Sequence, residues 1–358
     1  MLGLAGTLPD SYRSVFLGFA EGGRARPFLG EAGRAGHSVV ELRENAPRYR
    51  AAICEVAGHL RDLRAEVLCC HGYKPDILGL AAARRAGVPV VGVSRGWTGA
   101  TWKVRLNERL DRLCLRRMDR VVCVSEGQAV KVRRAGVAPD RVVVVRNAID
   151  AGRFDRIDPS GRDELLAMFP GPPPGCVVGA AGRLSPEKGF GVLVEAAASV
   201  AREHPDAGFV LFGDGPLRDD LERAVASAGL SGRFVLAGFR DDLDRLAPHF
   251  DLLALPSFTE GLPNVALEAA AAGVAVVATA VGGTPEAVED GVNGLLVPPG
   301  DPRALAGRIA DLLGDEEARR EFGRRGRDRI RSEFTFEAQA AQYAALFHEL
   351  AGARRARA

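Results

Sequence analysis

The stretch Phe258-Thr-Glu-Gly-Leu-Pro-Asn264, followed four residues later by Glu268, carries the most information about this 358-residue chain. It comes directly after the short apolar run at residues 251–256, which has the pattern of a buried strand. It precedes residues 265–272, which are strong helix formers. The stretch is therefore predicted to lie at the carboxyl end of a strand, where open α/β sheets bind their ligands.

Two kinds of ligand-binding group occur at this turn. Backbone N–H groups at the start of a helix, together with the helix dipole, suit a phosphate, and proline suits a first helical turn. The residues concerned are Gly261, Leu262, Pro263 and Asn264. Glu260 and Glu268 add two carboxylates that suit sugar hydroxyls, so the turn predicts a nucleotide-sugar site. An ordinary turn with two surface acids explains this stretch equally well when it is taken alone.

A second loop favours the ligand site. Gly182-Arg-Leu-Ser-Pro-Glu-Lys-Gly189 connects a strand predicted at residues 176–181 to a helix predicted at residues 190–201. Its Arg183 and Lys188 offer a planar fork and a point charge, which suit a diphosphate. Isolated cations are usually solvated, but these two occupy a strand-to-helix loop in the same half of the chain as the carboxylates.

Together these motifs resemble the retaining glycosyltransferases of family 4, over about residues 177–349. The resemblance rests on the Arg183 and Lys188 pair, on the spacing of Glu260 and Glu268, and on motifs that occur in the family's order. These motifs are Gly213-Asp-Gly-Pro216, Val281-Gly-Gly283 and Asp290-Gly-Val-Asn-Gly-Leu-Leu-Val297. The implied fold is GT-B, an α/β architecture of two Rossmann-like domains whose parallel sheets face each other across a cleft.

The resemblance also implies roles for the donor residues. Arg183 and Lys188, in the loop that opens with Gly182, would hold the donor diphosphate and stabilise it as it leaves. Glu268 would bind the ribose, and Glu260 would orient the transferred sugar. The backbone of residues 261–264 would cap the phosphates, and Gly238 with Phe239 would border the nucleobase. The implied reaction retains the anomeric configuration by front-face attack, with no metal and no cofactor beyond the nucleotide-sugar substrate.

Strand and helix patterns alternate along the whole chain, which predicts parallel sheets. In the first half we expect strands at residues 2–6, 39–42, 65–70, 88–93, 120–124 and 141–145. We assign residues 1–147 to an acceptor-binding domain and residues 148–335 to a donor-binding domain. The helix predicted at residues 336–350 would pack back on the first domain, and a basic tail runs to residue 358.

The candidate acceptor residues are His71, Arg95, Trp97 and Arg13. His71 follows a predicted strand, although a lone histidine is more often structural. Many relatives have histidine where this chain has Arg95, so Arg95 would instead bind a phosphate or an acidic acceptor, and Trp97 would stack on a sugar or lipid. The alternatives are that Arg95 pairs with an acid and Trp97 packs in the core.

Arg13 depends on the register of the first strand. With a strand at residues 2–6, Arg13 lies in the following loop and residues 14–26 form a helix. In the competing register residues 15–20 form the strand, and Gly22-Gly23 becomes the family's glycine loop. We prefer the first register.

Composition narrows the function classes. The chain has 48 Lys and Arg against 46 Asp and Glu, so its net charge of +2 gives no reason to expect nucleic-acid binding. No apolar run is long enough to span a bilayer and no secretory signal is present, which favours the cytoplasm, with contact at the inner membrane face left open. Six cysteines lack metal-ligand spacing and are expected to be buried free thiols.

The family resemblance therefore implies a retaining, hexosyltransferase-type enzyme. It would move a sugar from a UDP- or GDP-sugar to a hydroxyl of a glycan or lipid-linked acceptor in cell-surface polysaccharide or glycolipid synthesis. Two alternatives stay open, a nucleotide-sugar 2-epimerase of the same fold and a catalytically silent sugar-nucleotide binding subunit. A dehydrogenase is disfavoured, because no G-x-G-x-x-G follows the first strand.

Overall fold

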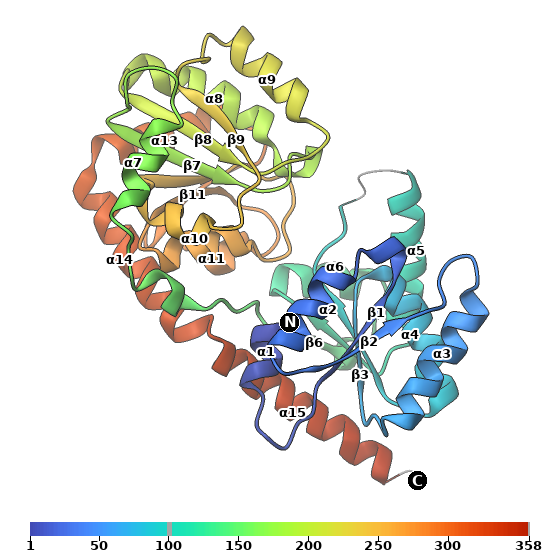
Figure 1. The fold of residues 1–358 in the computed structure, drawn as a ribbon. Helices are drawn as coiled ribbons and strands as arrows, with labels where there is room; N and C mark the ends of the chain where they lie inside the picture. Colours follow the sequence, from blue (N-terminus) through green and yellow to red (C-terminus); the bar gives the residue numbers. More distant parts are fainter. Residues whose placement is uncertain (99–101, 357–358) are drawn as a thin grey trace. The chain divides into compact units, whose positions relative to one another are not determined.

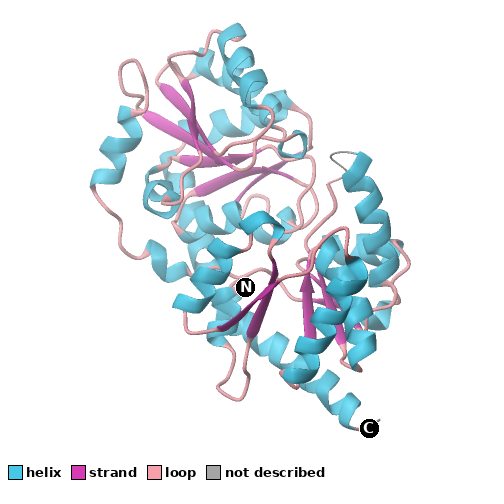
Figure 2. Cartoon of the chain, turned by 45° about the vertical axis from the view of Figure 1, so that its right-hand side comes forward, coloured by secondary structure: helices cyan, strands magenta, loops and turns pink. Residues whose placement is uncertain are grey.

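The computed structural model describes residues 1–98 and 102–356, and it divides the chain into two compact units. Unit 1 comprises residues 1–148 and 336–358, and unit 2 comprises residues 149–335. In both units parallel strands lie among helices, as the predicted α/β fold requires (Figures 1 and 2).

Unit 2 is built on a six-stranded parallel sheet in the order β12-β11-β10-β7-β8-β9. Its strands are β7 (Cys176–Ala181), β8 (Ala207–Phe212), β9 (Phe234–Gly238), β10 (Leu252–Leu255), β11 (Ala275–Thr279) and β12 (Gly294–Val297). Its helices are α7 (Ser160–Ala167), α8 (Phe190–Glu203), α9 (Arg218–Ser227), α10 (Leu243–Leu246), α11 (Asn264–Ala271), α12 (Thr284–Ala287), α13 (Pro302–Gly314) and α14 (Glu316–Glu333).

The strands of this sheet are nearly continuous apolar runs, because helices cover both faces. On one face, side chains of α8, α9 and α13 pack against β7 and β8 in a single core that includes Leu193, Leu221, Ile309 and Phe209. Helices α11 and α14 pack against each other, and α14 also contacts β11 (Figure 1).

The order in which the strands are added to this sheet reverses between β7 and β10. Strands β8 and β9 follow outward on one side of β7, and β11 and β12 follow outward on the other side of β10. In open parallel sheets the crevice at such a switch point, beyond the carboxyl ends of the strands, is where ligands bind. Both predicted donor loops begin there, since one follows β7 and the other follows β10.

Unit 1 contains a four-stranded parallel sheet, β3-β4-β5-β6, and a separate parallel pair, β1-β2. Its strands are β1 (Val15–Phe19), β2 (Ser38–Leu42), β3 (Leu68–His71), β4 (Val90–Ser94), β5 (Arg120–Cys123) and β6 (Val142–Val144). Its helices are α1 (Leu2–Thr7), α2 (Arg26–Arg34), α3 (Tyr49–Asp62), α4 (Tyr73–Ala86), α5 (Trp102–Leu115), α6 (Glu126–Arg134) and α15 (Phe336–Arg355).

The preferred register of the first strand is wrong. Residues 2–6 lie in helix α1, and the first strand is β1, so the competing register is the one that forms. Helix α1 packs against α15, and a Cβ on Gly3 would lie only 2.3 Å from the ring of Phe336. Gly22 and Gly23 have φ angles of +69° and +95° and follow β1 directly, where glycine is favoured.

Helix α15 is a structural part of unit 1. Its Tyr343, Leu346 and Leu350 pack against Val93 and Val122 of β4 and β5. The helix continues to Arg355, so most of the expected basic tail is helical, and residues 357 and 358 lie outside the described residues.

Two further expectations meet the structure here. All six cysteines are free thiols, but Cys54 is exposed rather than buried, whereas Cys70 and Cys123 are buried. Within residues 1–98 and 102–356 no helix combines the length and the apolar character needed to cross a membrane.

Candidate active site

At the switch point of unit 2 the loops after β7 and β10 are joined by backbone contacts. The amide of Phe258 donates to the carbonyl oxygen of Glu187 at 2.8 Å. Gly189 has a φ of +66°, and a Cβ there would lie 2.2 Å from the carbonyl oxygen of Pro256. Only glycine allows this close approach, so the two loops are held together by main-chain packing.

Glu260 is the centre of the site's polar contacts. Its Oε1 accepts from Lys188 Nζ at 2.6 Å and from the buried Ser257 hydroxyl at 2.7 Å. Ser257 is fixed in turn, because its carbonyl oxygen accepts from Thr279 Oγ1 at 2.5 Å. Glu260 is only 9% exposed, so a charged partner is needed to compensate its burial. Both side-chain contacts use Oε1, and the described residues make no hydrogen bond to Oε2.

A third loop packs against the backbone of Glu260. Gly282 follows β11 with a φ of +55°, and a Cβ there would lie 1.8 Å from the carbonyl oxygen of Glu260. The loop after β8 packs in the same way, since a Cβ on Gly213 would lie 1.9 Å from the carbonyl oxygen of Gly182. These contacts explain the Gly-Gly and Gly-Asp-Gly motifs as close backbone packing.

Arg183 and Lys188 differ in their partners. Lys188 is engaged with Glu260, whereas the guanidinium of Arg183 forms no hydrogen bond or ion pair with the part of the chain that the structure describes. The loop thus carries one cation compensated by a buried carboxylate and one that is not compensated. The positive charge in this loop that could attract a diphosphate is therefore that of Arg183.

Glu268 occupies a different environment from Glu260. It lies on the same side of α11 as Val265 and Ala269, in a pocket lined also by Phe154 and Asp244. Burial raises the pKa of the Glu268 carboxyl, Asp244 acts in the same direction, and Arg153 opposes them. The structure joins Glu260 to Lys188 and Ser257, but among the described residues it shows no contact that joins Glu260 to Glu268.

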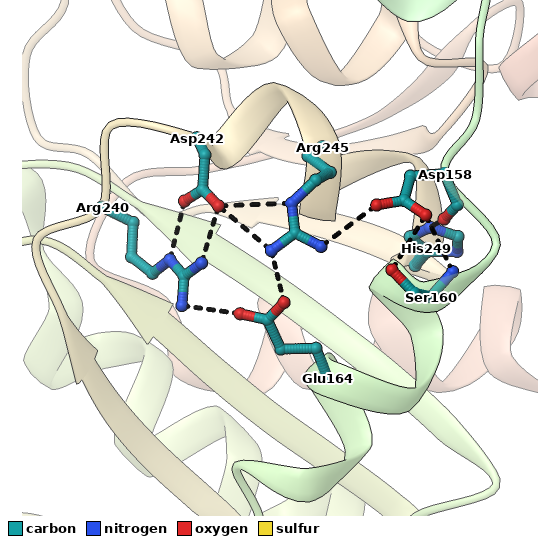
Figure 3. Close-up of polar contacts among 7 residues, drawn as sticks. All are labelled: Asp158, Ser160, Glu164, Arg240, Asp242, Arg245 and His249. Atoms are coloured by element: carbon teal, nitrogen blue, oxygen red, sulfur yellow. Dashed lines mark hydrogen bonds and ion pairs between the residues drawn. The ribbon is translucent and has the colours of Figure 1, made fainter.

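The loop after β9 is held by an ion-pair network that the sequence analysis missed (Figure 3). Arg240 binds both carboxylate oxygens of Asp242 at 2.7 and 2.6 Å, and also Glu164 of α7 at 2.8 Å. Arg245 bridges Asp242, Glu164 and Asp158, and these arginines lower the pKa of Asp242. No local pattern reveals this network, because its members come from segments about 80 residues apart.

The network fixes the loop that carries Phe239. Gly238 accepts a hydrogen bond from the amide of Gly213 at 2.8 Å and has a φ of +80°. Phe239 itself is 76% exposed, which is unusual for a large aromatic side chain. An exposed aromatic ring on a loop at the carboxyl end of this sheet is suited to contact a planar base.

Two of the four predicted acceptor residues of unit 1 lie together. His71 and Arg95 meet at the carboxyl ends of β3 and β4, where Arg95 Nη2 donates to His71 Nδ1 at 3.3 Å. Burial lowers the pKa of His71 to about 3, and the charge of Arg95 adds to this effect. The imidazole is therefore neutral, and its other nitrogen faces Cys69 Sγ at 3.6 Å. Among the described residues, Arg95 pairs with this histidine and not with an acid.

Trp97 and Arg13 lie elsewhere. The indole N–H of Trp97 donates to Asp111 at 2.9 Å, its ring packs on the unit 1 core, and Arg112 covers it at 4.6 Å. The alternative, that Trp97 is a packing residue, is the one the structure supports. Arg13 precedes β1 and approaches Ser38 at the amino ends of β1 and β2, whereas His71 and Arg95 lie at the carboxyl ends of β3 and β4. Its assignment fails with the register on which it depended.

Comparison with known proteins shows similarity over both units of the chain. The profile of the family "Glycosyl transferases group 1" matches residues 175–315, and that of the family "Glycosyl transferase 4-like domain" matches residues 2–148. The lipopolysaccharide core biosynthesis glycosyltransferase LpsE of Rhizobium meliloti is 33% identical over 74% of this chain and 73% of that protein. The chain belongs to the group 1 glycosyltransferases.

Other similarities extend the comparison. The 2-deoxystreptamine glucosyltransferase of Streptomyces kanamyceticus is 35% identical over 63% of this chain, and the match spans 59% of that relative's length. The Anabaena protein HepE, solved with UDP, has the same fold, with a TM-score of 0.80 at 23% identity over 94% of this chain and all of that one. A second HepE structure contains UDP-glucose. This group 1 glycosyltransferase therefore has the GT-B fold.

Proposed function

We propose that this glycosyltransferase binds a nucleotide-sugar at the switch point of unit 2 and transfers the sugar, with retention, to a hydroxyl of a glycan or lipid-linked acceptor. Such an acceptor belongs to cell-surface polysaccharide or glycolipid synthesis, as the name of LpsE suggests for that relative. The observation that carries the proposal is the contact of Lys188 with Glu260, in a loop that also holds the uncompensated Arg183. A backbone hydrogen bond joins the two loops at the switch point.

The chemistry follows from where charge develops. When the glycosidic phosphate bond breaks, negative charge grows on the diphosphate, which Arg183 and Lys188 would stabilise. Glu260, held through Oε1, would offer Oε2 to a sugar hydroxyl and so fix the reacting carbon. With Oε1 already bonded twice, Glu260 serves better as a positioning carboxylate than as a nucleophile, which favours attack assisted by the leaving group.

The other donor contacts are part of the same proposal. The backbone of residues 261–264 would cap the phosphates, and Phe239 would border the base. Glu268, buried beside Asp244, would bind the ribose hydroxyls. HepE binds UDP and UDP-glucose, which makes UDP-sugars the first donors to test. We propose no metal or cofactor in the reaction.

Calorimetric titration tests the donor site. We would titrate UDP, GDP, ADP and their sugar conjugates into the protein, into Arg183→Ala, and into Arg320→Ala, an exposed unit 2 arginine on α14 that pairs with Glu316. We expect one nucleotide to bind and its affinity to fall about 10- to 100-fold in Arg183→Ala only, as the loss of a charge-assisted hydrogen bond predicts. No binding, or equal affinity in both variants, would refute the donor site.

Product analysis tests the reaction itself. With the bound donor and a panel of acceptors, NMR of the product should show the donor's anomeric configuration. An inverted product would contradict the front-face mechanism. A new nucleotide-sugar formed without any acceptor would instead identify an epimerase.

A further inference from the structure

Helix α5 of unit 1 carries several large apolar side chains on its exposed side. Its buried charged residues are acids, Glu108 and Asp111, each only 5% exposed. Leu115 is buried with them, but four other large apolar side chains point outward: Trp102 is 70% exposed, and three leucines are between 43% and 50% exposed. These leucines are Leu106, Leu110 and Leu113. Their spacing of four, four and three residues places all four apolar side chains along one side of the helix.

The buried acids explain why the helix is oriented this way. Asp111 accepts from the indole of Trp97 at 2.9 Å, and Glu108 accepts from the backbone amide of Thr98 at 2.7 Å. Both contacts tie α5 to the loop after β4. With these acids fixed inward, the apolar row cannot rotate into the core without exposing them and breaking both bonds. The row is therefore a permanent feature of the surface.

Within residues 102–117 the exposed charged side chains are all cations. The acids of residues 102–117 are Glu108 and Asp111, both buried, whereas Lys103, Arg105 and Arg109 are exposed beside the row. Arg116 and Arg117 are exposed just beyond its end. We call the four apolar side chains with these five cations the α5 outer face. Figure 1 shows α5 on the outside of its unit, next to α4.

We propose that the α5 outer face docks on an anionic lipid bilayer. A helix with a tryptophan and leucine row flanked by lysine and arginine lies in the membrane interface, with the apolar side chains among the acyl chains and the cations at the head groups. Each cation near such a surface is attracted to the anionic lipids. One partner would thus contact both the apolar row and the cations.

Other occupants fit less well. A second copy of this chain, meeting it through the same face, would set five cations against five others. A nucleic acid would satisfy the cations, but its phosphates would meet four apolar side chains in the middle of the face. Neither partner accounts for both halves of the pattern.

Vesicle sedimentation tests the proposal without donor or acceptor, so its failure would leave the proposed donor site untouched. The protein should bind vesicles that contain phosphatidylglycerol and not vesicles of phosphatidylcholine alone, and added salt should weaken the binding. Arg105→Gln with Arg109→Gln should weaken it about 30-fold, and Leu106→Ser with Leu110→Ser at least about 10-fold. Matched controls in unit 2, Arg308→Gln with Arg320→Gln and the half-exposed Ile157→Ser, should bind as the wild type does.

Tryptophan fluorescence gives a second readout. The chain has two tryptophans, and Trp97 is held by Asp111, so a blue shift on vesicle addition should come from Trp102 and disappear in Trp102→Phe. Absence of binding at low salt, or unchanged binding in both pairs of variants, would overturn the proposal. So would a change from dimer to monomer in the leucine variant, because the face would then be an interface between copies.

Discussion

The substitution Gly282→Ala tests whether the position of Glu260 controls turnover. A Cβ at residue 282 would lie 1.8 Å from the carbonyl oxygen of Glu260, whereas real Cβ contacts are essentially never under 3.0 Å, so one backbone must move by about 1.2 Å. A misplacement of about 1 Å at a catalytic group can cost about 100-fold in rate. The alanine must also adopt a φ near +55°, which costs about 1–2 kcal/mol of stability.

Gly291→Ala separates these two effects. Gly291 has a φ of +72°, but a Cβ there would have nothing within 4 Å. Both variants place an alanine at a positive φ, but Gly282→Ala also creates the clash with Glu260, so it should lose more stability than Gly291→Ala in thermal unfolding. Only Gly282→Ala should lose about 100-fold in turnover, measured as release of nucleoside diphosphate from the donor. Equal turnover in the two variants would refute the claim that the loop after β11 positions Glu260.

Three further predictions concern ionisable groups. Lys188→Met should destabilise the protein by about 3 kcal/mol, because it leaves a buried carboxylate unpaired. Adding Glu260→Gln should restore stability in urea but not turnover, and recovery of turnover would contradict the role of Lys188. Glu268→Ala should weaken donor binding in calorimetry more than it lowers turnover at saturating donor, and an unchanged donor affinity would exclude the ribose contact. Burial and the neighbouring Asp111 raise the pKa of Asp76 above its unfolded value. The free energy of unfolding should therefore fall as pH rises from about 4 toward that folded pKa, by at most about 1.4 kcal/mol per pH unit. Urea unfolding at several pH values measures this, and the same pH dependence in Asp76→Asn as in the wild type would argue against a proton on Asp76.

The donor half of the fold was predictable because its signals are local. A run such as Cys176–Ala181 is buried on both faces of the sheet, so its sequence is continuously apolar and predicts its strand. The loops after such strands then carry glycines and charges at fixed positions. The order of the strands in the sheet places two of these loops side by side, and this is why residues 72 positions apart, Lys188 and Glu260, meet.

The start of the chain was not predictable in the same way. A five-residue apolar run with two glycines suits a strand or a helix equally well when judged locally. The outcome is decided by α15, more than 300 residues later, whose Phe336 needs the space that Gly3 leaves. The same limit applies to Trp97 and to the Arg240 network, whose partners come from other elements. Sequence motifs report what a loop offers, while tertiary contacts decide which side chains are already used.

Lys188 already has a partner and Arg183 has none among the described residues, and this difference gives the two cations different roles in the proposed reaction. The charge of Lys188 is already balanced by Glu260 at 2.6 Å, so an approaching diphosphate gains little from it at first. The charge of Arg183 has no such partner among the described residues, so it should supply most of the attraction that binds the donor. As the glycosidic bond breaks, the leaving diphosphate gains charge and competes with Glu260 for the ammonium group. Lys188 should therefore act mainly on turnover and Arg183 mainly on affinity, which is the division that transition-state stabilisation requires.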